Sequence, residues 1–455
     1  MTRVLIVGGG IGGIATALAL ERHGVEHVVL EQAGRFGEVG AGIQLSPNGM
    51  RVLAWLGLGS VLEAVSVEPE AHVFREWRTG ETLLTLPLGR AVREAYGAPY
   101  LHAHRADLLG AMTEALGDDR VRLGCRVTAV RQDARGVEAV LENGSVERGD
   151  VLVGADGIHS TVRDLLFAPE EPRPSGYAAW RGLVRADTAA ALGIERCSYI
   201  WLGPGRSVVL YYVSAGRQVN WVGIGPSPSS APPSSETPSS GTSSALRESW
   251  SATGSAEALA REHAGWHPQI LGLLAATERP FLTLLYDRHP LASWVRGRAV
   301  LLGDAAHAML PYHAQGAVQS LEDAWVLASC LAAADGAAPA TGGTGAHGHA
   351  GTSAAGEAQV ASSGLAEGID AALRRYETLR KDRATQVQAY SRAAQDWYHV
   401  SDPRGLERRS ERFRALRRRG AAGFSSQQEW LYAYDADRAA RGTDDAWRAM
   451  RWRAE

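Results

Sequence analysis

The first 31 residues combine apolar runs and glycine turns in a pattern typical of a βαβ unit. Val4–Val7 is a short apolar run, which predicts a buried parallel strand. Apolar residues recur at helical spacing over Ile14–His23, and Gly24 stands where a helix commonly ends in the left-handed conformation. His27–Glu31 is a second apolar run that ends in an acid. The chain is therefore predicted to begin with strand, helix and strand.

The pattern changes further along the chain. Ser207–Val213 and Val219–Gly225 show strand-like patterns, which indicate strands of a β-rich second domain. From Ala371 onward the pattern is helical and rich in arginine. Two segments, Pro226–Ser244 and Ala334–Gly364, contain almost no large apolar residue. Because neither can bury enough apolar surface to order itself, the first is predicted to be a disordered insert and the second a low-complexity surface insertion.

Length and charge narrow the class of protein. A chain of 455 residues is too long for one simple core, so two domains with appendages are expected. With 45% apolar residues and a net charge of −3, nothing indicates a nucleic-acid or membrane partner. The apolar run Val4–Leu20 is too short and too rich in glycine for a membrane span. Glu407–Arg419 holds seven arginines without a nucleic-acid-binding motif, and we interpret it as a solvated or subunit-facing helix.

The three cysteines, Cys125, Cys197 and Cys330, are scattered without CxxC spacing. This spacing argues against a disulfide framework and against a zinc site. A reducing cytoplasm is the expected location.

Gly8, Gly10 and Gly13 form a GxGxxG pattern between the first predicted strand and helix. The first glycine permits the tight turn, the second lets the backbone approach a pyrophosphate, and the third lets the helix pack on the sheet. The helix N-terminus adds unpaired N–H groups and a favourable dipole. Glu31 follows Gly13 by 18 residues, where its carboxylate can accept from a ribose. These features predict a dinucleotide site, without separating NAD from FAD.

Two further patterns, a second glycine match and a cluster of acidic and histidine residues, are not interpreted as binding sites of their own. A second GxGxxG match at residues 343–348 lies in low-complexity sequence with no strand before it and no helix after it. Asp304, His307 and His313 lie within ten residues, but no second cluster of ligands accompanies them. A metal site is therefore not expected.

Two later segments also place a turn at the carboxyl end of an apolar strand. Asp150–Leu166 predicts a strand, a turn containing Asp156-Gly157, and a helix. Arg296–Leu310 predicts a strand that ends in Gly303-Asp304, followed by a helix-forming run. Ligands bind at the carboxyl ends of parallel strands. Asp304 is therefore expected in the ligand crevice.

The glycine pattern with Glu31, the Asp156-Gly157 turn and the Gly303-Asp304 turn together resemble, in order and spacing, the motifs of the class A flavoprotein monooxygenases. The resemblance extends to about Leu331, apart from the Ser/Pro-rich run. Finer matches point to the salicylate hydroxylase and 3-hydroxybenzoate 6-hydroxylase branch, which also contains 6-hydroxynicotinate 3-monooxygenase. These matches are Val39–Leu53, His104–Leu109, Tyr177–Val184 and Leu310–Leu327.

This resemblance implies an α/β fold with a Rossmann-like FAD-binding domain of the glutathione-reductase type, similar to p-hydroxybenzoate hydroxylase, a β-rich substrate domain and C-terminal helices. The FAD-binding domain is expected to be discontinuous, over residues 1–66, 100–172 and 279–333. The substrate domain is expected over 67–99 and 173–278, with the disordered insert at 226–244. Residues 334–364 would be the low-complexity insertion and 365–455 the C-terminal helical region.

The resemblance also implies the residues that hold a tight, non-covalent FAD. The ADP half is expected at Gly8, Gly10, Gly13, Glu31 and Gln32, with Val127 beside the adenine. Arg105 is expected at the pyrophosphate or ribityl region, Gly303 and Asp304 at the ribityl hydroxyls, and Gly42, Pro311, Gly316 and Ala317 around the flavin ring. In this family the turn at Asp156 serves both FAD and the nicotinamide donor. NADH or NADPH would bind only transiently, because no second nucleotide-binding domain is found.

In this family NAD(P)H reduces FAD, O₂ adds at the flavin C4a, and the hydroperoxide transfers oxygen to an electron-rich ring. A phenol is activated by losing its proton, so a base or proton relay is expected. This chain departs from its relatives at these positions. It has Ser207 and Tyr312 where different relatives have histidines, and Gln44 where the hydroxynicotinate enzymes have a histidine. It also has Pro311 where the 3-hydroxybenzoate enzymes have a glutamine.

Gln44, Tyr211, Tyr312 and His313 are the candidate catalytic residues, with His313 as the predicted proton acceptor. Tyr211 is equally consistent with a core aromatic on a strand, and His313 with a residue that faces solvent or packs on the flavin.

Three other residues have a substrate role as an alternative. Trp180 and Trp221 are expected in the core in preference to the pocket. Arg181 can pair with a substrate carboxylate or form a structural ion pair.

The predicted function is FAD-dependent hydroxylation of a small phenolic, salicylate- or hydroxybenzoate-like ring with O₂ and NAD(P)H. The protein is expected to be a monomer or homodimer with no nucleic-acid or membrane partner. Three alternatives stay open: an oxygenase that hydroxylates or epoxidises a larger natural-product ring, a non-oxygenating NAD-dependent dehydrogenase, and a nucleotide-binding module without catalysis. A colourless protein that cannot be loaded with FAD would exclude the flavin.

Overall fold

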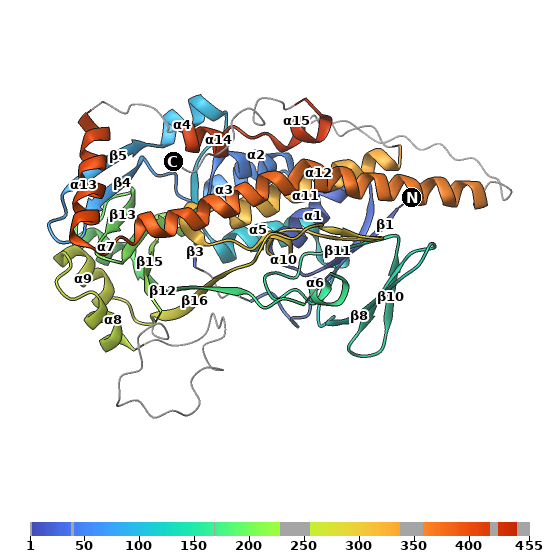
Figure 1. Ribbon diagram of the computed structural model, residues 1–455, viewed down its shortest axis with the longest axis horizontal. Helices are drawn as coiled ribbons and strands as arrows, with labels where there is room; N and C mark the ends of the chain where they lie inside the picture. Colours follow the sequence, from blue (N-terminus) through green and yellow to red (C-terminus); the bar gives the residue numbers. More distant parts are fainter. Residues whose placement is uncertain are drawn as a thin grey trace.

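The computed structural model describes residues 2–37, 41–167, 169–227, 255–336, 358–418 and 426–443. A six-stranded sheet forms one half of the molecule (Figure 1). Its order is β17 (Val295–Arg296), β18 (Ala299–Leu301), β11 (Val151–Gly154), β1 (Arg3–Val7), β2 (Glu26–Leu30) and β7 (Val121–Arg122). All neighbours are parallel except β17 and β18. The predicted opening strand, helix and strand are confirmed.

Helices cover this sheet. Helix α1 (Ile11–Arg22) packs on α11 (Gly316–Ala334) and α5 (Arg105–Leu116). Helix α1 begins three residues before the predicted start at Ile14, because the last glycine of the turn is itself helical. The shorter helices α2 (Pro47–Trp55), α3 (Gly59–Val65), α6 (Thr161–Leu166) and α10 (Asp304–His307) complete this half.

A seven-stranded sheet forms the second half. Its order is β16 (Phe281–Asp287), β12 (Arg173–Arg185), β15 (Gln218–Pro226), β14 (Ser207–Val213), β13 (Ser198–Leu202), β4 (Ala71–Glu76) and β5 (Thr82–Pro87). Helices α7 (Ala186–Ala191), α8 (Ala256–Glu262) and α9 (Pro268–Ala275) accompany it, and residues of all three share a hydrophobic core with its strands. Because β16 pairs with β12, this sheet extends past the predicted boundary at residue 278.

The described residues also form two small sheets and several short helices. Strands β3 (Gly42–Leu45) and β6 (Leu101–His104) form one, and β8 (Val127–Gln132), β9 (Val137–Leu141) and β10 (Val146–Gly149) form the other. The remaining short elements are α4 (Gly89–Tyr96) and the 3₁₀ turns η1 (Asp118–Arg120), η2 (Ser214–Gly216) and η4 (Pro311–His313).

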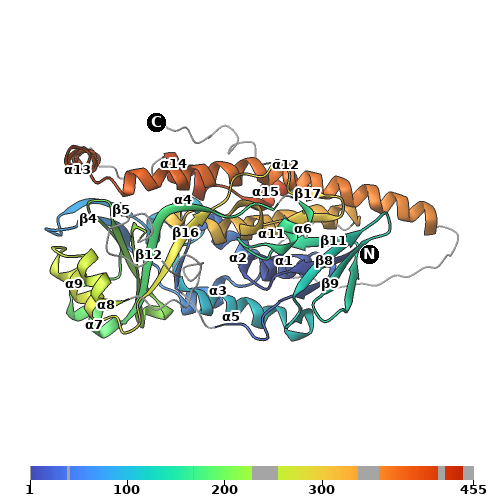
Figure 2. The same ribbon diagram turned by 60° about the horizontal axis from the view of Figure 1, so that its bottom comes forward.

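The C-terminal helices connect the two halves. Figure 2 shows α12 (Ala358–Tyr398) running along the molecule, followed by α13 (Pro403–Arg418), α14 (Ser426–Tyr432) and α15 (Ala436–Arg441). Helix α13 packs on β5 through the buried Phe413, so the arginine-rich segment is only partly solvated, in contrast to the solvated or subunit-facing helix predicted. Arg404, Arg408 and Arg412 form its exposed side.

Two predicted boundaries need correction. Pro226, predicted as the first residue of the disordered insert, is the last residue of β15 and pairs with Tyr177. Helix α12 begins at Ala358, inside the predicted low-complexity insertion, because an alanine-rich run can extend a long helix without large apolar residues. Residues 228–244, residues 337–357 and the second glycine match at 343–348 lie outside the described residues.

Candidate active site

The glycine turn between β1 and α1 has the shape of a phosphate cradle. Gly8 has φ +108°, a conformation that side chains rarely adopt. A Cβ on Gly13 would lie 1.9 Å from the Gly8 carbonyl oxygen, so only glycine fits there. A Cβ on Gly10 would meet nothing within 4 Å. The turn is therefore closed against the protein at Gly13 and open beside Gly10, where a pyrophosphate can approach the helix N-terminus.

Glu31 is fixed beside this turn by two backbone groups. Its Oε2 accepts from the Gly9 N–H at 2.6 Å and its Oε1 from the Ala33 N–H at 2.8 Å. A carboxylate has further lone pairs for a ribose hydroxyl. Gln32 is exposed next to it, and the Val127 side chain is buried in the core, so any contact of Val127 with an adenine would come from its backbone.

The Asp156-Gly157 turn lies against the glycine turn, since a Cβ on Gly8 would be 2.5 Å from the Ala155 carbonyl oxygen. The Asp156 carboxylate accepts from the Ser160 hydroxyl at 2.5 Å and from the Val162 N–H at 3.1 Å, at the start of α6. Burial raises the pKa of Asp156, and these hydrogen bonds partly offset the rise. The described contacts of this carboxylate are therefore those of a helix cap.

Asp304 follows β18, where Gly303 has φ +58°, and it lines the same cavity as Arg105. Its side chain is exposed toward the cavity, whose walls surround it. This enclosure raises the pKa of Asp304, and His307 and Arg105 partly offset the rise. An acceptor at the end of the strand and a guanidinium beside it suit a sugar alcohol linked to phosphate.

Gly316 and Ala317 are the first two residues of the 19-residue helix α11 and line this cavity as well. The N–H groups in the first turn of a helix have no partner within the helix and lie at the positive end of its dipole. This helix end can therefore stabilise negative charge, as predicted for the pyrimidine edge of a flavin. Pro311 lies in the preceding 3₁₀ turn and is exposed.

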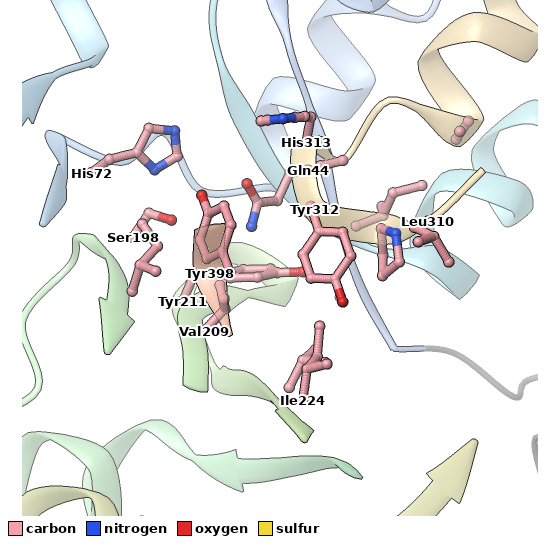
Figure 3. A pocket seen from close by; sticks show the side chains of 18 of the residues that line it. Gln44, His72, Ser198, Val209, Tyr211, Ile224, Leu310, Tyr312, His313 and Tyr398 are labelled. Carbon is pink, nitrogen blue, oxygen red and sulfur yellow. The ribbon is translucent and has the colours of Figure 1, made fainter. Parts of the chain in front are cut away.

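The cavity has a volume of about 330 Å³ and lies between strands of the seven-stranded sheet on one side and β3, η4 and the C-terminal helices on the other (Figure 3). All four candidate catalytic residues line it: Gln44 from β3, Tyr211 from β14, and Tyr312 and His313 from η4. Gln44 Oε1 accepts from the Tyr100 hydroxyl at 2.6 Å. A Cβ on Gly42 would lie 2.7 Å from the Tyr211 ring, which makes glycine necessary here too.

His313 does not project freely into the cavity. Its ring stacks on Tyr390 of α12, with centroids 3.8 Å apart and planes 6° apart. Burial lowers the pKa of His313 to about 3, so the imidazole is neutral near pH 7. The stacking on Tyr390 restricts how this ring can approach a molecule in the cavity, and its predicted role as proton acceptor stays a prediction.

The sequence profile described as the FAD binding domain matches residues 1–248 and 284–342. The chain is 36% identical to 3-amino-4-hydroxybenzoate 2-monooxygenase of Streptomyces platensis, over 95% of this chain and 96% of the relative. It is 33% identical to salicylate hydroxylase of Pseudomonas putida, over 88% and 87% of the two chains. The chain belongs to the FAD-dependent aromatic monooxygenases.

The solved structures that are similar to this monooxygenase agree with its family assignment. Klebsiella pneumoniae HpxO complexed with FAD and uric acid has a TM-score of 0.73 and 27% identity, covering 98% of this chain and 97% of that one. A salicylate hydroxylase substrate complex has a TM-score of 0.73 and 26% identity, covering 97% of both. The predicted family, fold class and FAD cofactor are confirmed, and the glycine cradle, Asp304 and the α11 N-terminus fit that cofactor.

Several cavity residues of this monooxygenase were not predicted. Arg181, left open between two roles, lines the cavity, whereas Trp180 and Trp221 lie in the core of the second sheet. His72 lies on strand β4, and Tyr100 directly precedes strand β6. Tyr390, Tyr398, Gln428, Leu431 and Tyr432 come from the C-terminal region. No local motif marks these residues, because their position depends on how distant segments pack.

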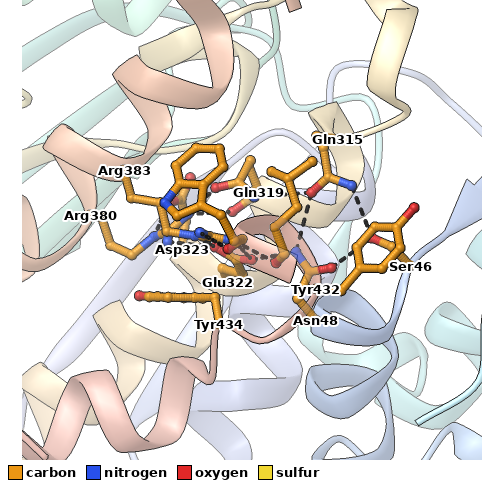
Figure 4. A network of polar contacts seen from close by, with 12 residues as sticks. Ser46, Asn48, Gln315, Gln319, Glu322, Asp323, Arg380, Arg383, Tyr432 and Tyr434 are labelled. Atoms are coloured by element: carbon orange, nitrogen blue, oxygen red, sulfur yellow. Dashed lines mark hydrogen bonds and ion pairs between the residues drawn. The ribbon is translucent and has the colours of Figure 1, made fainter. Parts of the chain in front are cut away.

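A buried polar network ties the C-terminal region to the flavin side of the cavity (Figure 4). Gln315, the residue before α11, accepts from Asn48, and Asn48 also donates to Glu322 at 2.7 Å. Glu322 pairs with Arg380 at 2.6 Å and with Arg383 at 2.8 Å, all three fully buried. Arg383 in turn donates to the carbonyls of residues 430 and 431.

Asp323, the next residue of α11, holds the Gly303-Asp304 turn from behind. Its carboxylate accepts from the Gly303 N–H at 3.0 Å, from His307 at 2.6 Å and from Arg380 at 2.8 Å. The buried partner of the His307 imidazole is therefore Asp323.

Stability of this monooxygenase should depend on the ionisation of Asp323. Burial alone would raise the pKa of Asp323, but His307 and Arg380 outweigh it and lower the pKa from 3.8 to about 2. A lowered carboxyl pKa contributes stability above pH 4 that is lost as the pH falls toward 2. Asp323→Asn is therefore expected to lower the unfolding free energy by about 2 kcal/mol above pH 5, with a difference that narrows between pH 4 and 2. Urea denaturation across this range measures it, and a pH-independent difference would contradict the assignment.

Among the described residues, none of the helices is long and apolar enough to cross a membrane. Within the same ranges, no three His, Cys, Asp or Glu side chains form a group able to hold a metal ion.

Proposed function

We propose that this monooxygenase hydroxylates a small phenolic ring that carries a carboxylate, of the hydroxybenzoate kind. The observation that carries the proposal is the position of Arg181, which lines the same cavity as Tyr211 and whose charge lowers the pKa of that tyrosine against the larger effect of burial. A planar guanidinium matches a carboxylate. The two relatives above are named for 3-amino-4-hydroxybenzoate and for salicylate, which both carry a carboxylate.

The size and walls of the cavity support a small ring. A volume of about 330 Å³ is at the lower end for a ligand pocket. Apolar side chains from the strands β4, β13, β14 and β15 line much of the cavity: Phe74, Ile200, Val209, Val222 and Ile224. These support hydroxylation of a single ring over the larger natural-product ring that the sequence left open.

When bound, FAD accepts a hydride from NADH or NADPH and activates O₂. We place its phosphates at Gly10 and Arg105, its ribityl chain at Asp304 and its pyrimidine edge at Gly316 and Ala317. The enclosed cavity would then keep water away from the ring, and Gln44 and Tyr211 would contact the substrate. Tyr312, beside the predicted flavin edge, would lie next to the reacting carbon.

The direct test is oxidation of NADH and NADPH by the FAD-loaded enzyme with a panel of ring compounds. The panel contains 3-amino-4-hydroxybenzoate, salicylate, 3-hydroxybenzoate, 6-hydroxynicotinate and larger fused-ring phenols. A small phenolic carboxylate is expected to accelerate oxidation and to yield a hydroxylated product by mass spectrometry. Acceleration by fused-ring phenols alone would favour the larger-ring alternative, and no acceleration by any phenol would reject the proposal.

Arg181→Gln tests the carboxylate contact. The variant is expected to raise KM for a phenolic carboxylate about 100-fold, because a charge-assisted pair contributes roughly 1.5–3 kcal/mol. KM for the matching phenol without a carboxylate should change little. Arg185→Gln is the matched control, since Arg185 ends the same strand and pairs with Asp187 at the surface. Equal effects of Arg181→Gln on both phenols would contradict the contact.

A further inference from the structure

A histidine from the C-terminal region lies behind the wall of the cavity. His399 follows α12 directly and is only 4% exposed. Its Nε2 lies 3.1 Å from the Ser207 hydroxyl oxygen, and its Nδ1 lies 3.4 Å from the Tyr312 hydroxyl oxygen. Ser207 and Tyr312 both line the cavity, from β14 and η4. One imidazole thus connects two cavity hydroxyls that are more than 100 residues apart in sequence.

The imidazole is held in this orientation by its neighbours. The ring of Tyr177 stacks on it, with centroids 4.5 Å apart and planes 22° apart. Tyr312 meets it edge-on at 5.4 Å and itself stacks on Tyr398, which Figure 3 shows on the same wall. The backbone N–H of His399 donates to the Gln395 carbonyl at 3.1 Å, which fixes the main chain at this residue. Both ring nitrogens therefore keep their hydroxyl partners.

The surroundings of His399 keep it uncharged at rest. Burial lowers the pKa of His399 to about 3, and the positive charges of Arg409 and Arg206 contribute to this shift. The groups that face the ring are thus Ser207 and Arg206 from the β13–β14 hairpin, Arg409 from α13, and the two tyrosines. Tyr312 is influenced in addition by the exposed Asp396 and by Arg392. A neutral imidazole with a donor on one nitrogen and an acceptor on the other can pass a proton without storing it.

We propose that Ser207 and His399 form a proton relay that carries the proton of the substrate hydroxyl to Tyr312. In this relay the substrate O–H bond breaks and its electron pair stays on the ring oxygen. The proton moves to the Ser207 oxygen while the Ser207 proton moves to His399 Nε2. The proton on Nδ1 passes to the Tyr312 oxygen, and the Tyr312 proton passes to a solvent water molecule, since this residue is partly exposed. One proton is transferred and nothing is oxidised or reduced.

This inference rests on the proposed function, because it requires a phenolic substrate. It adds a residue that lies outside the matched FAD-binding domain, which ends at residue 342. Ser207 would touch the substrate, and His399 would act through Ser207 as a positioning residue. The rival is His313, whose Nε2 has no hydrogen-bond partner in the described part of the chain.

The test compares kcat, KM and pH dependence in FAD-loaded variants, with 3-amino-4-hydroxybenzoate or, if that is not turned over, with salicylate. Ser207→Ala and His399→Gln are expected to lower kcat at pH 7 about 100-fold with KM nearly unchanged, because general acid–base groups contribute at least this much. In both variants kcat should rise about tenfold for each unit by which the pH is raised, because a larger fraction of the phenol is then ionised without the relay. Ser207→Thr keeps the hydroxyl and should retain most of the wild-type rate.

The chain offers a matched control. Ser329 and His23 form a second serine–histidine pair, 3.3 Å apart and remote from the cavity. Ser329→Ala and His23→Gln should keep wild-type kcat and its pH profile. A wild-type kcat in Ser207→Ala and His399→Gln would overturn the relay while leaving the proposed function intact. A loss of kcat in these two variants without recovery at high pH would also overturn the relay. The variant His313→Phe tests the rival, and recovery of kcat at high pH in this variant alone would likewise overturn the relay. No hydroxylation of any panel phenol by the wild type would instead reject the proposed function, and the relay with it.

Discussion

Gly13→Ala is expected to yield a chain that retains no FAD and is unstable even without it. The added Cβ would lie 1.9 Å from the Gly8 carbonyl oxygen, far inside contact distance. Backbone atoms cannot move aside as a flexible side chain can, so α1 must shift away from β1. Because this helix packs on α11 and α5, we expect a loss of about 4 kcal/mol in the free energy of unfolding. Thermal melting by circular dichroism and the flavin absorbance of the purified protein measure both effects.

Gly10→Ala is the matched control for this substitution. The added Cβ meets nothing within 4 Å, and Gly10 has φ −76°, which alanine adopts readily. The apoprotein should therefore melt at the wild-type temperature. FAD should bind at least about tenfold more weakly, a change of 1.4 kcal/mol or more, because the methyl group occupies the space beside the turn. A flavin-loaded Gly13→Ala variant with wild-type melting would contradict the steric account.

Glu322→Gln is expected to destabilise the protein by about 3–5 kcal/mol. Its carboxylate is fully buried and receives hydrogen bonds from Arg380, Arg383 and Asn48. Burial would raise the pKa of Glu322, but the two arginines lower it below its usual value, so the group is ionised at neutral pH. Neutralising it leaves two buried guanidinium groups with one remaining carboxylate, Asp323. Urea denaturation of the FAD-loaded protein measures the loss.

Two further variants separate this effect from a general loss of packing. Glu322→Gln combined with Arg383→Met should recover part of the lost stability, because the unpaired charge is removed. Asp370→Asn breaks an exposed pair with Arg374 on α12 and should leave the unfolding midpoint unchanged. FAD affinity should fall in both variants that lack Glu322 and not in Asp370→Asn, because Asn48 connects Glu322 to Gln315 at the start of α11. An unchanged midpoint in Glu322→Gln would show that the network carries no net stability.

The features that sequence reasoning predicted are those whose signal is local. Gly8, Gly10 and Gly13 lie within one turn, and their chemistry follows from their spacing alone. Asp304 was expected in the crevice because an apolar strand directly precedes it. Strand β14 has the predicted bounds, Ser207–Val213, because β-branched and aromatic residues fill this run and nearly all of them are buried.

The features that sequence reasoning missed depend on contacts between segments that are far apart in the sequence. His313 was expected at the reacting ring, but Tyr390 of α12 lies flat against it. Tyr432 reaches the cavity because Arg51 of α2 donates to its carbonyl, a contact between residues 381 positions apart. Neither the composition nor the periodicity of the sequence near Tyr390 or Tyr432 predicts these long-range contacts. The C-terminal region therefore had no predicted role, although it supplies part of the cavity wall.

The residues that form this part of the cavity wall are synthesised long after the nucleotide-binding turn. The ribosome delivers the strands and helices around Gly8–Glu31 well before residues 428–432, and domains generally fold in the order of synthesis. The place for the cofactor can thus form while the cavity beside it is still open on one side. Only when residues 428–432 have been synthesised and bound by Arg51 and Arg383 does the cavity become enclosed. A prematurely terminated chain would keep the cradle for the nucleotide and lack the chamber that separates the reacting ring from water.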